Sequence, residues 1–399
     1  MDEPVMMSFG RYQVLGSLAK TGAGERFLAR SSSGDHHVVR AIEDAAFDEA
    51  RRAAWLRHPN LVAVRELGGD DGRRYVATEY VHGEDLRRLL ARVRRVHDHV
   101  PIAIVIAIGA AAAAGLHHAH THSGSRRSRH GSVHGRLTAS SILVGHDGIV
   151  KVEGLGIAGP TDASYLAPEQ VAGAPPDRRS DVFALGVVLY ELVTARRLFR
   201  APSDVLTRAA IAHPNIPAPS RFRRGLPRAL ENIILRALAP APADRFRSAG
   251  ELRDALVAFA KRVGMGQSQA GVADYVKQMF GAPPLPWLPA AQVRAARLAL
   301  DAFDDDLDTS EGLGVAAPPD WVLRELGVPE ARELEATPGR GTKTPMSWTS
   351  QPMQQPPPRP WTPRRLALLA GATAASVIVG YLSVGMIAGG GGDDEVAPM

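Results

Sequence analysis

The chain contains no cysteine among its 399 residues. This absence excludes disulfide bonds, thiolate chemistry and cysteine-ligated zinc. The chain also lacks a strong excess of either charge. It has 47 lysines and arginines and 42 aspartates and glutamates, which gives a net charge of +5. No basic stretch is interleaved with aromatic residues, so we expect no nucleic-acid partner. A composition of 45% hydrophobic and 22% charged residues is typical of a globular body with a sizeable core.

Long uncharged apolar runs are scarce, and one that could cross a membrane lies late in the chain. Residues 366–388 carry no charge and are long enough for one helix across a hydrocarbon core of about 30 Å. Arg364 and Arg365 precede this run and acidic residues follow it, so the positive-inside rule places the preceding body in the cytoplasm. We therefore predict a single-pass protein of the inner, cytoplasmic membrane with a short extracytoplasmic tail at 389–399. The alternative is an alanine-rich core helix.

The region before this run divides in two. Residues 36–42 and 73–81 read as strands, residues 47–58 have helical spacing, and two apolar runs at 142–144 and 149–152 flank the hairpin-turn letters GHDG. Long apolar helices are predicted at 101–120 and at 180–195, the latter with Ser180 as its N-cap. Residues 263–363 are predicted to contain helices at 273–280 and 290–305, and then to form a Pro-rich flexible linker.

Four motifs occur in a fixed order along residues 11–262. The letters EYV are followed by GEDLRRLL, YLAPEQ contains Ala-Pro-Glu at 167–169, RRSDVFALGVVLYELVTA contains Asp181, and ADRFRSAGEL contains Arg245. In this order they resemble a bacterial Ser/Thr protein kinase. The resemblance implies an α+β, two-lobed protein-kinase-like fold over residues 9–262, with a small β-rich N-lobe and a larger helical C-lobe, followed by the transmembrane helix. It also implies an ion pair between Glu169 and Arg245, and bracing of the catalytic loop by His134 and Asp181.

The residues that carry the chemistry in that family are replaced. The family pattern H-R-D-L-K-x-x-N-I-L falls on HGRLTASSIL and D-F-G falls on GLG, so the degenerate catalytic positions are His134, Arg136, Thr138, Ser141 and Gly154. Arginine is always protonated and cannot accept a proton from a substrate hydroxyl. Serine and glycine also remove the two oxygens that would hold Mg²⁺, so we expect no metal. Glu153 adjoins the vacated position, but alternation along a strand is expected to turn it to the other side.

The positions that bind nucleotide in that family are degenerate as well. The Gly-rich loop falls on residues 19–24, the strand lysine falls on Arg40 and its helix partner on Glu49. The resemblance therefore implies a degenerate nucleotide site made of Gly22, Gly24, Arg40, Glu49, Thr78, Glu79 and Val81. No cofactor follows with certainty from these residues, and binding of ATP without Mg²⁺ is the alternative to an empty site. An arginine–glutamate pair between Arg40 and Glu49 could still couple sheet to helix.

Together these features predict a membrane-anchored pseudokinase that acts as a signalling scaffold or regulator. The alternative is a divergent Ser/Thr kinase with weak ATP-dependent phosphorylation of proteins, so enzyme status stays open. The expected partners are other proteins, among them an active kinase or a second copy paired through the membrane helix. Ala372, Ser376 and Gly380 lie four residues apart on one face of that helix, where small side chains permit close approach. The alternative is that these residues only reflect an alanine-rich composition.

Overall fold

The structure is a computed structural model. It describes residues 7–21, 24–70, 72–96, 98–122, 131–157 and 162–281. Gly22, the later part of the predicted linker and the predicted transmembrane segment 366–388 lie outside the described residues.

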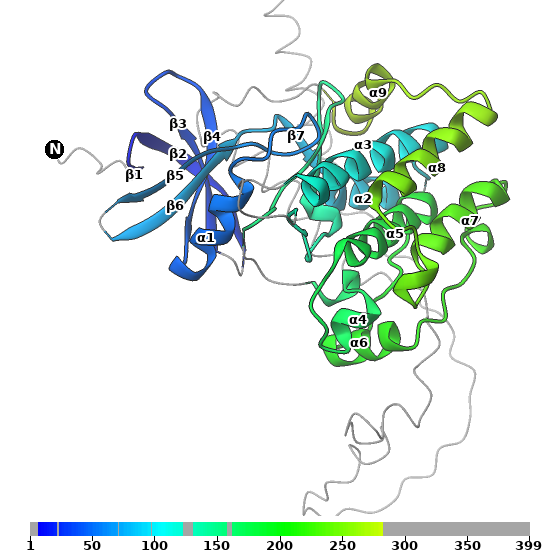
Figure 1. The fold of residues 1–399 in the computed structure, drawn as a ribbon. Coiled ribbons are helices and arrows are strands. Elements are labelled where there is room, and N and C mark those ends of the chain that lie inside the picture. Colours follow the sequence, from blue (N-terminus) through cyan, green and yellow to red (C-terminus); the bar gives the residue numbers. More distant parts are fainter. Residues whose placement is uncertain are drawn as a thin grey trace, which may run out of the picture. The chain divides into compact units, whose positions relative to one another are not determined.

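The N-terminal region is an antiparallel sheet of six strands in the order β1-β2-β3-β4-β6-β5. The strands are β1 (Ser8–Phe9), β2 (Tyr12–Thr21), β3 (Gly24–Arg30), β4 (His36–Ile42), β5 (Val64–Asp70) and β6 (Arg73–Glu79). The helix α1 (Asp44–Ala53) connects β4 to the β5 end of the sheet, and these elements are drawn in blue in Figure 1. The strands predicted at 36–42 and 73–81 are thus present, and the predicted helix begins three residues early, at Asp44.

The sheet closes over a small core of its own. Its buried members are Phe9, Tyr12, Ala29, Val39, Tyr75 and Ala77. The two tyrosine hydroxyls at its edge donate to the same carboxylate, Tyr12 to Oε2 of Glu66 at 3.1 Å and Tyr75 to Oε1 at 2.8 Å. The polar ends of the rings are thereby satisfied while the rings pack with the apolar residues.

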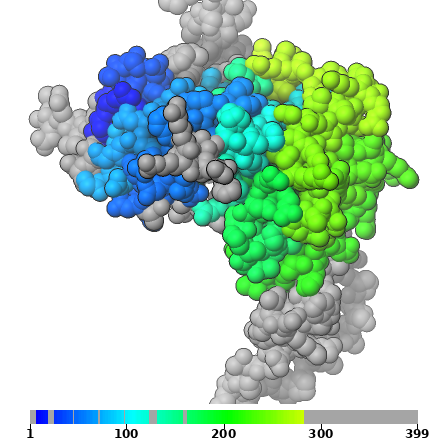
Figure 2. Space-filling view, viewed as in Figure 1, coloured from blue at the N-terminus to red at the C-terminus, as the bar shows by residue number. Residues whose placement is uncertain are grey.

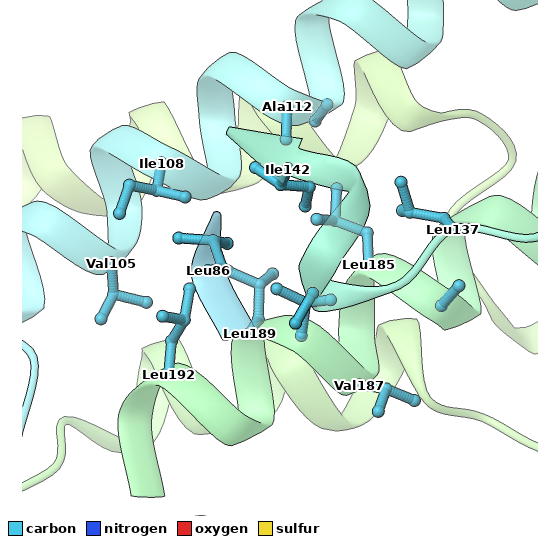
Figure 3. Close-up of a cluster of buried hydrophobic side chains, with 14 of the residues drawn as sticks. Leu86, Val105, Ile108, Ala112, Leu137, Ile142, Leu185, Val187, Leu189 and Leu192 are labelled. Atoms are coloured by element: carbon cyan, nitrogen blue, oxygen red, sulfur yellow. The ribbon is translucent and has the colours of Figure 1, made fainter. Parts of the chain in front are cut away.

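The C-terminal region is mainly helical and contains the larger core. Its helices are α2 (Leu86–Arg95), α3 (Ile102–Thr121), α4 (Pro168–Val171), α5 (Arg178–Thr194), α6 (Asp204–Ala212), α7 (Arg228–Ala237), α8 (Ala249–Arg262) and α9 (Gln269–Phe280). Figure 3 shows side chains of α3 and α5, among them Val105, Ile108 and Leu189, meeting around Ile142. Figure 2 shows the helical region, in cyan to yellow-green, beside the blue N-terminal strands.

The helix α3 is largely apolar, and every residue from Ile102 to His120 is at least partly buried. Among the described residues it is long and apolar enough to cross a membrane, with a mean hydropathy of 1.8 in its best window. More than half of that window is buried inside the protein, which is typical of a central core helix. Gly109 permits this packing, since a Cβ there would lie 2.6 Å from Cδ2 of Leu189.

The N-terminus of α5 differs from the expectation. Asp177 is the N-cap, and its carboxylate accepts from the backbone N–H of Arg179 at 2.6 Å. Ser180 is the third residue of the helix, where its hydroxyl accepts from the N–H of Asp177 at 3.1 Å. Asp177 and Ser180 together form a capping box. The pattern Asp-x-x-Ser has the same spacing as the more usual Ser-x-x-Glu.

A three-stranded sheet joins the two regions. Its strands are β7 (Gly83–Asp85), β8 (Ile142–Gly145) and β9 (Val150–Val152), with β8 between the other two. The predicted GHDG turn closes the β8–β9 hairpin, and Gly148 has a positive φ of 79° there.

The helix α9 extends the compact region past residue 262. A side chain at Gly148 would collide with the backbone oxygen of Gln269, so the hairpin and α9 lie in direct contact. Val272, Tyr275, Val276 and Met279 are buried in the main core. The helix predicted at 273–280 is present, but it belongs to this core rather than to a linker.

Candidate functional site

The loop before β8 is held by a single buried carboxylate. Asp181 of α5 accepts from the backbone N–H of His134 at 2.8 Å and of Gly135 at 2.7 Å. The ring of His120 at the end of α3 contacts the same carboxylate at 2.7 Å, and both side chains are 1% exposed. The ring of His134 bonds across the site to the backbone oxygen of Glu153 at 2.9 Å. The predicted bracing by His134 and Asp181 is present in these contacts.

Three replaced positions in this loop, Arg136, Thr138 and Ser141, carry neither a carboxylate nor an imidazole. Arg136, at the position of the expected base, is exposed. The Ser141 hydroxyl accepts from the backbone N–H of Thr138 at 3.2 Å and lies 3.1 Å from the Thr138 hydroxyl. Both side chains therefore close a local turn.

A cavity lies between the N-terminal sheet and the segment after β9. It has an empty volume of about 490 Å³ including its open mouth. Apolar side chains from β4, β5 and β6 form its walls, and Arg26, Arg40, Thr78, Glu153 and Gly154 contribute its polar or open positions. Gly154 has a φ of 90°, a conformation that favours glycine, and a Cβ there would lie 3.5 Å from the His134 ring.

An ion pair occupies the charged side of this cavity. The guanidinium of Arg26 donates to both oxygens of Glu153, at 2.8 Å each. Arg26 is directly opposite Arg40 in the β3–β4 pairing. Burial, together with the nearby Arg26 cation, lowers the pKa of Arg40 to about 10, and Glu153 opposes this shift. One carboxylate thus lies beside two cations that face each other across the sheet.

The position of Glu153 corrects the expectation that it turns away from the site. The strand β9 ends at Val152, so alternation along a strand no longer applies at 153 and 154. Arg26 was not among the sequence candidates. Its place opposite Arg40 depends on the β3–β4 register, which the structure supplies. The nearby Glu153 carboxylate offsets the repulsion between like charges directly opposite in a sheet.

Glu49 does not take part in this arrangement. Within the described residues, no ion pair joins it to Arg40, and it does not line the cavity. The helix α1 still lies close, since a Cβ at Gly156 would be 2.6 Å from the backbone oxygen of Glu49. The Gly-Leu-Gly segment therefore packs directly against α1, at the backbone of Glu49 and the side chain of Ala53.

Glu79, a predicted nucleotide position, instead joins the N-terminal sheet to β9 through hydrogen bonds and ion pairs. Lys151 donates to Oε1 of Glu79 at 2.7 Å, and the backbone N–H of Ala63 donates to the same atom at 3.0 Å. Arg65 pairs with the other oxygen at 3.2 Å. Thr78 lines the cavity and donates to the Val38 backbone oxygen at 3.4 Å.

Two predicted nucleotide positions remain outside the cavity walls. Val81 is partly buried in the segment before β7. Gly24 opens β3 and pairs with Thr21 across the hairpin.

The predicted pair of Glu169 and Arg245 is formed completely. Arg245 donates to both carboxylate oxygens at 2.8 Å each, and its side chain is 0% exposed. Its remaining donors reach the backbone oxygens of Ala239, Arg179 and Pro240, at 2.7, 3.0 and 2.8 Å. Burial alone would raise the pKa of Glu169, but hydrogen bonds from Arg245 and Ser180 lower it overall.

The residues present do not fit a family-type Mg²⁺ site. The carboxylate of Glu153 is held by Arg26, and the Ser141 hydroxyl is engaged with Thr138. Among the described ranges, no cluster of three or more histidines and carboxylates could hold a metal ion. The rings of His118 and His122 stack at 4.0 Å, but no carboxylate completes a site with them.

Comparison with known proteins agrees with this geometry. The family model "Protein kinase domain" matches residues 25–254. The chain is 33% identical over 305 residues to the tyrosine-protein kinase MasK of Myxococcus xanthus, an alignment that covers 70% of this chain and 47% of MasK. It is 31% identical over 269 residues to the serine/threonine-protein kinase PrkC of Bacillus subtilis, covering 61% of this chain and 39% of PrkC.

A solved structure is similar as well. The crystal structure of the Mycobacterium tuberculosis PknI kinase domain matches with a TM-score of 0.52 and 28% identity, covering 64% of this chain and 99% of that domain. The chain spans about half or less of the length of the curated relatives it matches. The two-lobed fold, the order of the motifs and the family match lead to one conclusion: the chain belongs to the protein kinase domain family.

Proposed function

We propose that this protein is a pseudokinase, a kinase-fold protein that regulates other proteins by binding and transfers little or no phosphate. The observation that carries the proposal is the ion pair between Arg26 and Glu153. Phosphoryl transfer depends on positioned metal charge over the transferred group. Here the carboxylate nearest to Gly154 is neutralised by a guanidinium, and Arg136 stands where a base would be needed.

The test is a phosphotransfer assay on the full chain with Mg²⁺ or Mn²⁺, measuring both self-phosphorylation and transfer to a general protein substrate. We expect incorporation at the level of a no-enzyme control. Arg136→Asp alone should not raise it, because groups that act as a unit fail together. Metal-dependent incorporation that grows with time and is lost in Gly154→Val would refute the proposal.

A divergent kinase with weak transfer is the second candidate, and one observation favours it. Glu153 lies inside the cavity beside Gly154, so its carboxylate could contact a metal if Arg26 released it. Arg26→Ala distinguishes the candidates. A weak kinase should gain transfer in this variant and lose it again when Glu153→Gln is added, whereas a pseudokinase should stay at background in both.

The regulatory role includes a membrane anchor. Support comes from the uncharged run at 366–388 with arginines before it and acids after it. We expect the anchor to pair with a second copy or with another kinase's anchor through the face of Ala372, Ser376 and Gly380. Crosslinking in membranes tests this: Ser376→Leu with Gly380→Leu should abolish association without preventing insertion, and unchanged association would exclude this face.

A further inference from the structure

Four exposed arginines lie on the C-terminal region, outside the lining of the cavity described above. They are Arg196, after α5, Arg221 and Arg224, in the turn that leads into α7, and Arg228, the first residue of α7. We call them the arginine patch. In the part of the chain that the structure describes, no carboxylate forms an ion pair with any of them.

The patch is built on a fixed turn. The guanidinium of Arg196 lies 5.1 Å from the ring centre of Phe222, and that of Arg221 lies 5.9 Å from it. Arg223 points inward and donates to the backbone oxygens of Val100 and Val193, at 2.8 and 3.3 Å. Because Arg223 anchors the turn, its neighbours Arg221 and Arg224 are held outward.

The acidic groups near the turn leave the patch a net positive charge. Glu231 accepts from the backbone N–H of Ser220 at 2.7 Å, so its carboxylate is already engaged. Asp98 contributes to the electrostatic environment of Arg223 rather than pairing with the four exposed arginines. A partner with several closely spaced carboxylates therefore complements this surface.

The described chain ends close to this turn. Tyr275 of α9 and Arg223 lie in each other's electrostatic field, and Arg92 of α2 donates to the backbone oxygen of Met279 at 3.0 Å. Residues 282–300 then separate Gly281 from the next strongly charged stretch. With residues 282–289 extended and 290–300 helical, this segment spans up to about 45 Å, so that stretch is within reach of the patch.

That stretch has the complementary composition. Residues 301–312 contain no lysine or arginine, and their acidic residues are Asp301, Asp304, Asp305, Asp306, Asp308 and Glu311. Two apolar residues, Phe303 and Leu307, lie among them in the sequence. We propose that residues 301–312 of this chain dock on the arginine patch.

The contact has a definite physical character. Exposed ion pairs are individually weak and are screened within about 8 Å at physiological salt. Tethering through the same chain gives the acidic segment a high effective concentration at the patch, so several weak pairs suffice. Docking holds the beginning of the segment that leads toward the proposed anchor against the C-terminal region, and salt or a stronger polyanion releases it.

The chain has no cysteine, so introduced pairs can be crosslinked specifically. In the purified full chain, Ser220→Cys with Thr309→Cys places one thiol beside the patch and one in the acidic segment. The matched control is Ser32→Cys with Thr309→Cys, because Ser32 is exposed in the β3–β4 turn. A short bis-maleimide should link the first pair at least fivefold faster than the control in 50 mM NaCl, and the advantage should vanish in 1 M NaCl.

Charge reversal completes the test. Arg221→Glu with Arg224→Glu should remove the crosslinking advantage, and adding Asp304→Lys, Asp305→Lys and Asp306→Lys should restore it. Equal crosslinking at both sites, or an advantage that survives the reversal, overturns the proposal. Sedimentation with vesicles of phosphatidylcholine and phosphatidylglycerol tests the competing occupant: patch-dependent vesicle binding without the crosslinking advantage would assign the patch to lipid and overturn the proposal.

Discussion

Arg26 and Glu153 are 127 residues apart, yet two hydrogen bonds of 2.8 Å join the guanidinium of the first to the carboxylate of the second. The pair bridges β3 and the segment after β9, beside the position where the family places its metal-binding aspartate. Both side chains are partly shielded, with 26% and 18% of their surfaces exposed. The cavity therefore contains its own counter-ion.

The two partners of this pair should not be equivalent for stability. Glu153→Gln removes the carboxylate that lies beside Arg26 and Arg40 and should lower the free energy of unfolding by about 1 to 3 kcal/mol. Arg26→Gln leaves Glu153 beside Arg40 and should cost less than about 1 kcal/mol. Urea denaturation of the two variants measures the order, and a larger loss in Arg26→Gln would mean that Arg40 does not depend on Glu153.

The framework pair should matter more than the vacated catalytic position. Arg245→Ala leaves the Glu169 carboxylate with only the Ser180 hydroxyl as side-chain donor and removes the guanidinium from three backbone oxygens, and should cost about 3 to 5 kcal/mol. Glu169→Ala should cost a similar amount, and the double variant should lose much less than the sum. Arg136→Ala should stay within about 0.5 kcal/mol, because Arg136 is exposed. If Arg136→Ala is the most damaging by denaturation midpoint, the loop is not open as described.

Two helix caps should respond to pH with opposite signs. Burial raises the pKa of Asp85, the N-cap of α2, to about 6, although the N–H of Arg88 opposes this shift. A raised pKa favours the protonated form, so this contribution to stability is present at low pH and is lost as the pH rises through about 6. Asp85→Asn keeps the cap and should stabilise the domain by about 1 to 3 kcal/mol at pH 7.5, with no gain at pH 4.

The matched control is Asp177→Asn at the N-cap of α5. Burial would raise the pKa of Asp177, but its hydrogen bonds with Arg179 lower it overall. Its contribution is present above the unfolded pKa and is lost as the pH falls, so the asparagine variant should be less stable than the parent at pH 7.5. A loss of stability at pH 7.5 in both variants would show that the Asp85 carboxylate is favourable where it lies.

The helix α9 should be an integral part of the domain. Tyr275 is buried in the main core, and burial raises its pKa to about 12. Tyr275→Ala should cost about 3 kcal/mol in unfolding free energy, whereas Lys277→Ala on the exposed side of the same helix should cost almost nothing. If both variants changed the thermal unfolding midpoint equally little, α9 would not be part of the folded core.

Much of the fold follows from local patterns in the sequence. The hairpin at GHDG, the strand 36–42 and the two long apolar helices have the periodicity or turn residues that their structures require. The framework pair was predictable because its motifs fix both registers. The start of α5 was not predictable, because Asp177 and Ser180 are both suitable N-cap residues. The burial of α9 was not predictable either, because it depends on contact with the distant hairpin at Gly148.

The replacement of the catalytic residues in the candidate site was predictable from the sequence, but the ion pair inside the cavity was not. The register of HGRLTASSIL identifies Arg136 and Ser141 as replacements. The direction of Glu153 depends on where β9 ends, and its pairing with Arg26 depends on a contact between segments far apart in sequence. Neither follows from composition or periodicity.

The central claim is that an internal ion pair has replaced the Mg²⁺ site of this cavity. Thermal unfolding of the full chain, titrated with ATP in parallel series containing Mg²⁺ or EDTA, tests it most directly, because ligand stabilisation grows as RT ln(1 + [L]/Kd). The account predicts the same shift in midpoint in both series, whether that shift is zero or small. A stabilisation of several degrees that appears only with Mg²⁺, and that disappears in Glu153→Gln, would contradict it.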